Sequence, residues 1–227
     1  YNANSPSQRV GGTVTKNFQT LQHKNRMYSL DNSYSKEDLL DWEKRLQKNL
    51  GTEAIEFTCE LKYDGASINL TYENGEFVKA VTRGDGFQGD EVTSNIRTIK
   101  SIPLILNADF ISNFEIRGEI ILPLEGFQKM NQERLENGEE TYRNPRNTAS
   151  GSLKLQDSGE VAKRPLDCLL YQVVSNERTY STHFESLEAS REAGFKVPDT
   201  IILASSIDEV FHFVNEWEHT HAFLQYN

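Results

Sequence analysis

The chain has little cysteine, no long apolar run and no excess of basic residues. Its 227 residues include two cysteines, Cys59 and Cys168, and a pair so far apart in sequence forms neither a CxxC metal site nor a dense disulfide framework. No stretch approaches the roughly 18 consecutive apolar residues that a membrane span requires. We therefore expect a soluble, cytoplasmic protein, long enough to bury a core in one domain or two small ones.

The charge balance is acidic, which argues against a general nucleic-acid-binding surface. The formal charge is −10 at pH 7, whereas affinity for DNA comes largely from Lys and Arg side chains that neutralise phosphates. The basic residues are unevenly spread, because residues 1–30 contain four of them and no acid. A local basic face is compatible with the acidic total.

The first residues contain neither an initiator Met nor an apolar signal segment, so we expect a piece of a longer protein. Residues 1–34 are rich in Asn, Ser, Gln and Gly without a sustained period, which predicts an extended linker. Residues 35–227 are expected to form the folded core.

The hydrophobic periods within this core change along the chain. Ser35, three residues before Asp38, predicts a capped helix that ends at Gly51. Further helices are expected at 93–102, 125–135, 184–193 and 207–223. Strands are expected at 114–122, with buried and exposed residues in alternation, and at 166–174. The mixture, without regular βαβ alternation, predicts an α+β fold with mainly antiparallel sheets flanked by helices.

A β-hairpin is predicted around Asn74-Gly75, which separates two runs of alternating residues. A two-residue turn would place Tyr72 opposite Phe77, Leu70 opposite Lys79, Ile68 opposite Val81 and Arg83 opposite Ala66. Arg83 would then be held near Lys62.

The most informative short segment is Cys59-Glu60-Leu61-Lys62-Tyr63-Asp64-Gly65. In an extended chain Glu60, Lys62 and Asp64 share one face. A lysine amine attacks phosphorus or carbonyl only when unprotonated, so burial or nearby cations must lower its pKa. Asp64 is suited to position the amine or a metal ion, and Gly65 to let the backbone approach a ligand. Alone, the segment is more often the solvated face of an amphipathic strand.

The motif and the segments around it together resemble a known protein family. Lys62-Tyr63-Asp64-Gly65 resembles the Lys-x-Asp-Gly element of DNA ligases, RNA ligases and mRNA capping enzymes. Further segments resemble the NAD-dependent DNA ligases of bacteria, in that family's order and near its spacing. They are Ser5 to Gly11, Met27 to Asn32, Thr82 to Thr93, Glu115 to Glu119 and Asn144 to Leu153.

The resemblance implies the nucleotidyltransferase (adenylation-domain) fold of the covalent ligase superfamily. It implies Lys62 as the adenylated nucleophile, with Asp64 as a second catalytic residue. Nucleotide contacts would come from Ser29, Leu30, Glu60, Lys62, Arg83 and Glu119. The alternatives are ordinary structural roles: an ion pair of Glu119 with Arg117 or another base, a cross-strand surface charge for Arg83, and a helix approach or core contact for Ser29 and Leu30.

Residues 143–164 carry five basic and two acidic residues, a net charge of +3 among small side chains. This suits a loop along a phosphate backbone, and the resemblance implies DNA contacts from Arg146 and Lys154. Lys154 stands where the family usually has arginine and lacks its bidentate fork. A solvated loop is the alternative.

The glycines at 84–89 fit turn geometry, and the scattered histidines predict no metal site.

In the intact protein the resemblance implies that Lys62 attacks NAD, forms ligase–AMP and releases nicotinamide mononucleotide, and that AMP then activates a nick for sealing. It implies nicked double-stranded DNA as partner, Mg²⁺, roles in DNA repair and replication, and a monomer, with zinc only in other parts of the protein. The isolated chain is expected to be poorly active, because two further pocket lysines of the family would follow residue 227. The alternatives are an ATP- or GTP-using RNA ligase or capping-type enzyme, and a non-catalytic nucleotide- or DNA-binding module.

Overall fold

The computed structural model describes residues 17–106, 110–177 and 180–220. By Cα packing they form two units: residues 17–27 with 63–198 (unit 1), and residues 28–62 with 199–220 (unit 2). None of the described helices is long and apolar enough to cross a membrane. The predicted boundary between a linker at 1–34 and a core at 35–227 stays a prediction.

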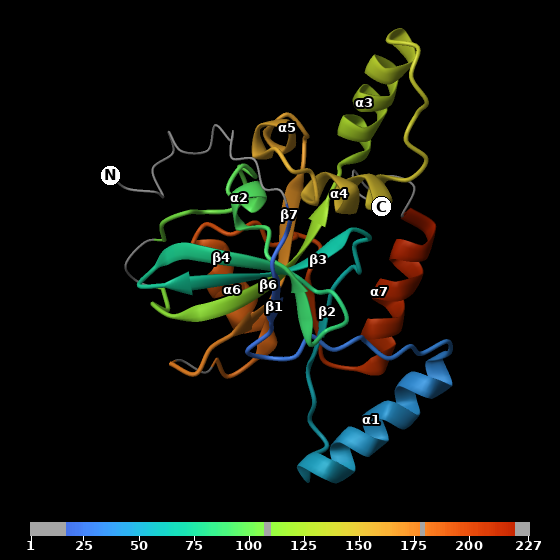
Figure 1. The fold of residues 1–227 in the computed structure, drawn as a ribbon. Helices are drawn as coiled ribbons and strands as arrows, with labels where there is room; N and C mark the ends of the chain where they lie inside the picture. The colour runs from blue at the N-terminus through green and yellow to red at the C-terminus, as the bar shows by residue number, and fades with distance from the viewer. Residues whose placement is uncertain (1–16, 107–109, 178–179, 221–227) are drawn as a thin grey trace. The chain divides into compact units, whose positions relative to one another are not determined.

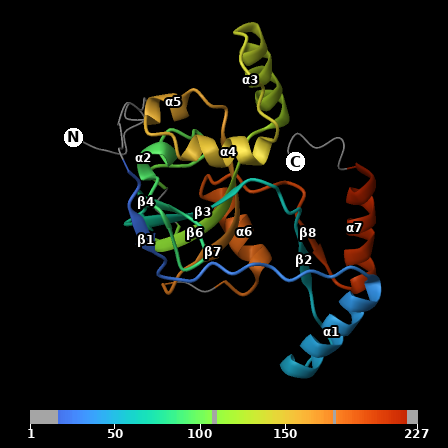
Figure 2. The same ribbon diagram turned by 45° about the vertical axis from the view of Figure 1, so that its right-hand side comes forward.

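Unit 1 is built on a four-stranded antiparallel sheet in the order β4-β3-β6-β7. Helix α6 lies on one face and the short β1–β5 pair on the other (Figures 1 and 2). The strands of unit 1 are β1 (Thr20–Gln22), β3 (Ala66–Glu73), β4 (Glu76–Thr82), β5 (Gln88–Asp90), β6 (Phe114–Ile121) and β7 (Asp167–Val174). Its helices are α2 (Thr93–Ile96), α3 (Leu124–Glu136), α4 (Pro145–Leu153), α5 (Ser158–Ala162) and α6 (His183–Glu192).

The core of unit 1 lies between the sheet and α6. Fully buried side chains come from all four strands of the sheet, and the ring of Tyr72 stacks on Phe114 with 4.9 Å between centroids. Each large side chain buried in this way contributes about 1.5–3 kcal/mol. β6 was predicted to alternate buried and exposed residues, and this is wrong. Glu115 and Arg117 are only 8% and 7% exposed, because β1 and the segment after it cover that face.

Unit 2 joins two segments that are distant in sequence. Its elements are α1 (Lys36–Leu50), β2 (Phe57–Cys59), β8 (Ile202–Ala204) and α7 (Ile207–Thr220). β2 pairs antiparallel with β8, and Phe57, Ile207 and Phe213 are buried in the core that α1 and α7 cover. The Lys36 ammonium also forms an ion pair of 2.5 Å with Asp208.

The ends of α1 confirm the predicted caps. The Ser35 hydroxyl accepts a hydrogen bond from the backbone N–H of Asp38, and Gly51 ends the helix with a φ of 67°. The helices predicted at 125–135 and 184–193 are also present, and Gly194 follows the latter with a φ of 97°. α7 begins at the predicted Ile207, and residues 221–223 of that prediction lie outside the described residues.

The predicted hairpin is present, but its register is correct only near the turn. Asn74 and Gly75 both have positive φ, and Tyr72 pairs with Phe77. A bulge at Val78 then shifts the pairing by one, so Ile68 faces Thr82 and not Val81. The extra residue places Val78 and Lys79 on the surface while Phe77 and Ala80 stay buried. The backbone N–H of Arg83 consequently donates to the carbonyl of Ser67, so Arg83 does not lie opposite Ala66 as predicted.

Two further predictions were wrong. The helix at 93–102 is only the four-residue α2, because Thr98 and Ile99 turn the chain by hydrogen bonds to the residues three positions earlier. The predicted loop at 143–164 contains α4 and α5, which begin at the side-chain caps Asn144 and Asp157. The α4 signal was present in the sequence, because Pro145 after Asn144 is a favoured helix start.

Candidate active site

The Glu119 carboxylate is held by the chain segment that follows the Lys-x-Asp-Gly motif. One oxygen accepts the backbone N–H of Gly65 at 3.2 Å, and the other accepts the Ser67 hydroxyl at 2.6 Å. Gly65 fits here because an added Cβ would lie 2.2 Å from the carbonyl oxygen of Ile120. Close packing against β6 therefore explains Gly65 without a ligand, and the paired strands fix the carboxylate in place.

Tyr171 joins this cluster and was not predicted from the sequence. It is the extra residue of a bulge in β7, since Arg117 pairs with Gln172 and Gly118 with Leu170. A bulge re-aims a side chain, and the Tyr171 phenol lies beside the Ser67 side chain. Burial, followed by the nearby Glu119 carboxylate, raises the pKa of Tyr171.

Arg83 lies beside the same cluster, at the start of a tight turn. Its carbonyl accepts the backbone N–H of Gly86 at 2.9 Å and lies 3.1 Å from Nε2 of His23. The Asp85 carboxylate accepts the N–H groups of Gln88 and Phe87, which lowers its pKa. The turn accounts for the glycines at 84–89. The Arg83 side chain is exposed, and it lies close enough to Tyr171 for its charge to act on the pKa of the phenol.

Arg117 does not take up the ion-pair role considered for it beside Glu119. Its guanidinium donates to the Gln172 side chain at 2.9 Å and to the carbonyls of Asn25 and Arg26 at 3.0 and 2.9 Å. These bonds hold the segment that precedes Met27 against the polar face of the sheet. Arg117 therefore has a structural role next to the candidate site.

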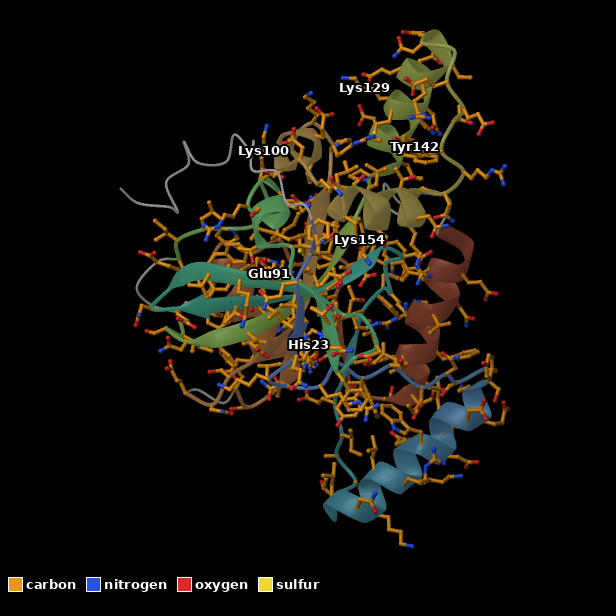
Figure 3. The ribbon with its side chains drawn as sticks, in the orientation of Figure 1. His23, Glu91, Lys100, Lys129, Tyr142 and Lys154 are labelled. Carbon is orange, nitrogen blue, oxygen red and sulfur yellow. The ribbon has the colours of Figure 1, made fainter. Side chains whose placement is uncertain are left out.

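The two predicted DNA contacts lie at the two ends of α4. Arg146, in its first turn, forms an ion pair of 3.0 Å with Asp64. Lys154, the residue that caps its C-terminus, forms an ion pair of 2.7 Å with Asp90 of β5. Figure 3 labels Lys154 beside α4. Both cations are more than half exposed, so each can also reach an external anion.

The other predicted site residues belong to unit 2. Lys62 follows β2 and is exposed, whereas Glu60 is half-buried. Ser29 is exposed, and Leu30 is 76% exposed, so the core contacts considered for these two residues are absent. Lys62 ends one segment of unit 2, and the chain passes at Tyr63 into unit 1, which holds Asp64, Arg83 and Glu119.

Comparison with known proteins identifies the relatives of this chain. The family model of the NAD-dependent DNA ligase adenylation domain matches residues 15–227. A DNA ligase of Flavobacterium psychrophilum is 65% identical over 226 residues, which are 100% of this chain and 34% of that protein. DNA ligases of Flavobacterium johnsoniae and Bacteroides fragilis are 64% and 47% identical, over 97% and 95% of this chain and 33% and 32% of those proteins. The chain thus spans about a third of the length of these relatives.

Proposed function

Because this chain belongs to the NAD-dependent DNA ligase adenylation-domain family, we propose that it is the self-adenylating part of a ligase that seals nicks in duplex DNA, with Lys62 as the nucleophile. The observation that carries the proposal is the anchoring of Glu119. Both of its carboxylate oxygens are bonded to Gly65 and Ser67, three and five residues after Lys62. The Glu119 carboxylate is thus bonded to the chain segment that directly follows Lys62.

The chemistry begins with a displacement at phosphorus. The unprotonated Lys62 amine attacks the α-phosphorus of the AMP half of NAD, forming an N–P bond while the P–O bond to nicotinamide mononucleotide breaks. The leaving group takes the electron pair, and the amine loses its second proton. In later steps the AMP passes to a 5′-phosphate, and a 3′-hydroxyl displaces it. The Lys62 side chain is exposed and therefore accessible to the substrate.

The remaining site residues would bind the nucleotide. A carboxylate such as that of Glu119 is a strong acceptor for ribose hydroxyl groups. The exposed Arg83 guanidinium would meet the phosphate side of the ligand. Leu30 and Ser29 would lie along the adenine, with Glu60 beside them. An apolar side chain as exposed as Leu30 gains stability when a ligand covers it.

Mg²⁺ would be held largely by substrate phosphates. The described residues include no cluster of three or more His, Cys, Asp or Glu side chains that could hold a metal ion. Mg²⁺ usually needs only one or two carboxylates besides phosphates and water, and Asp64 of the motif would supply one when its ion pair with Arg146 opens. The ion would neutralise charge that develops on the phosphates.

We propose that α4 contacts the phosphate backbone of nicked DNA. Its exposed residues include Arg146, Asn147 and Lys154. Gly151 is exposed inside the helix, and an added Cβ would meet nothing within 4 Å. Glycine inside a helix costs about 1 kcal/mol relative to alanine, and packing within the protein does not require it here. Close approach of an external backbone would account for its presence.

The proposal is tested by labelling the full-length protein with NAD or ATP that carries radioactive phosphorus next to adenosine. We expect covalent label and nicotinamide mononucleotide release with NAD only, and no label in Lys62→Ala. Lys129→Ala is the matched control, because Lys129 is an exposed lysine of α3. Exclusive labelling by ATP, or full labelling of Lys62→Ala, would refute the proposal.

The two buried, unpaired cysteines, Cys59 and Cys168, are compatible with the proposed cytoplasmic location.

A further inference from the structure

Both cations assigned to DNA contacts are already paired with an acid of the same chain. Arg146 lies 3.0 Å from Asp64, and Lys154 lies 2.7 Å from Asp90. A carboxylate and a phosphate oxygen offer the same kind of acceptor to a cation. Each cation therefore already has an acceptor of the kind that a DNA phosphate would offer.

The backbone at Asp90 is well fixed. Asp90 pairs with Thr20 across β1 and β5, and its backbone N–H donates to the Thr82 hydroxyl at 2.9 Å. Its side chain is 30% exposed, compared with 53% for Lys154. When the pair opens, the flexible lysine stem moves and the acid stays.

We propose that Asp90 is an intramolecular competitor of DNA phosphate for Lys154, which lowers the affinity of α4 for duplex DNA. This inference rests on the proposed DNA contact of α4. It assigns a regulatory role to an acid that the adenylation chemistry does not use. Asp64 has the same geometry with Arg146, but its place in the adenylation motif makes Asp90 the cleaner residue to test.

The competition has a defined electrostatic consequence. When Lys154 moves to a phosphate, one counterion leaves the DNA, but the uncovered Asp90 carboxylate attracts a cation. The net release of ions in the native protein is therefore smaller than the phosphate contact alone would give. Removing the charge of Asp90 should steepen the slope of log affinity against log salt by up to about 0.9, the value for one phosphate.

The test measures binding of nicked duplex DNA to the full-length protein by fluorescence anisotropy, from low to physiological salt. Exposed ion pairs have interaction energies that correspond to a factor of about 1.5 to 5 in an equilibrium constant. We expect Asp90→Asn to bind about two- to five-fold more tightly at low salt, with the steeper slope. Asp90→Ser should behave similarly, which guards against an effect specific to the amide.

Two controls separate competition for Lys154 from a general change in charge. Asp41→Asn removes the acid of another exposed ion pair, 3.2 Å from Lys44 in unit 2, and should leave DNA affinity unchanged. In a Lys154→Ala background, Asp90→Asn should have no further effect. Unchanged or weaker binding by Asp90→Asn and Asp90→Ser would overturn the inference, as would a gain that persists without Lys154.

Failure of this inference is distinguishable from failure of the proposed function. The same preparations are tested for covalent adenylation by NAD. If the native protein is adenylated but removal of the Asp90 charge does not change DNA binding, only the competition is refuted. Native protein that is not adenylated would sink the proposed function, whatever the DNA titrations show.

Discussion

The Ser67 hydroxyl donates a hydrogen bond of 2.6 Å to the Glu119 carboxylate, across the register pair that joins β3 to β6. The Tyr171 phenol from β7 lies beside the same Ser67 side chain. The two strands that flank β6 therefore place polar side chains beside its Glu119 carboxylate. Its position is set by the sheet rather than by a loop, which is how a binding group is best pre-organised.

Replacing Ser67 by alanine removes the donor and leaves one Glu119 oxygen without its protein partner. We expect a loss of about 1–2 kcal/mol in the free energy of unfolding, the range for a hydrogen bond to a charged group that is only partly buried. NAD-dependent adenylation should fall as well. Ser67→Thr keeps the hydroxyl and serves as the control. Urea denaturation and a labelling assay give the two values, and a Ser67→Ala protein as stable as native would contradict this account of the cluster.

Gly151→Ala should separate stability from DNA binding. The added methyl group meets nothing within 4 Å and removes the entropic cost of glycine in a helix, so unfolding should cost about 0.5–1 kcal/mol more. The methyl group would also obstruct a phosphate backbone lying on α4, and binding of nicked DNA should weaken. Thermal denaturation and a DNA titration measure the two effects. A protein that is more stable and binds DNA equally well would show that the backbone does not approach Gly151.

Tyr171 should make the protein sensitive to alkali. Burial raises its pKa above the ordinary value, so the folded protein retains a proton that the unfolded chain releases above about pH 10. The folded state then binds more protons than the unfolded state, and stability falls as the pH rises from about 10 towards the raised pKa. In Tyr171→Phe this decline should be shallower, as measured by urea denaturation between pH 8 and pH 11, about the range around the free phenol. An identical decline in both proteins would exclude Tyr171 as its source.

Local chemistry predicted much of the fold from the sequence. Ser35 marks the start of α1 and Gly51 its end, because a side-chain cap and a left-handed glycine act within a few residues. Asn74 and Gly75 specify their turn in the same way, since both adopt positive φ. The family was also predicted correctly, because several separate segments carried the resemblance.

Features that depend on tertiary contacts were not predicted. The bulges at Val78 and Tyr171 change the register of their strands, and no local pattern marks either. α4 was interpreted as a loop because its segment combines positive charge with small residues, although Asn144 provided a start signal. The partner of Lys154 is Asp90, 64 positions earlier, and only the folded sheet brings them together.

The most direct test of the central claim is to locate the adenylate on the chain. Full-length protein incubated with NAD and Mg²⁺ would be digested under neutral or alkaline conditions that preserve a phosphoramidate, and the modified peptide would be sequenced by mass spectrometry. We predict AMP on the Lys62 side chain and on no other lysine. AMP on a different residue, or an unmodified Lys62 in protein that seals nicks, would contradict the account.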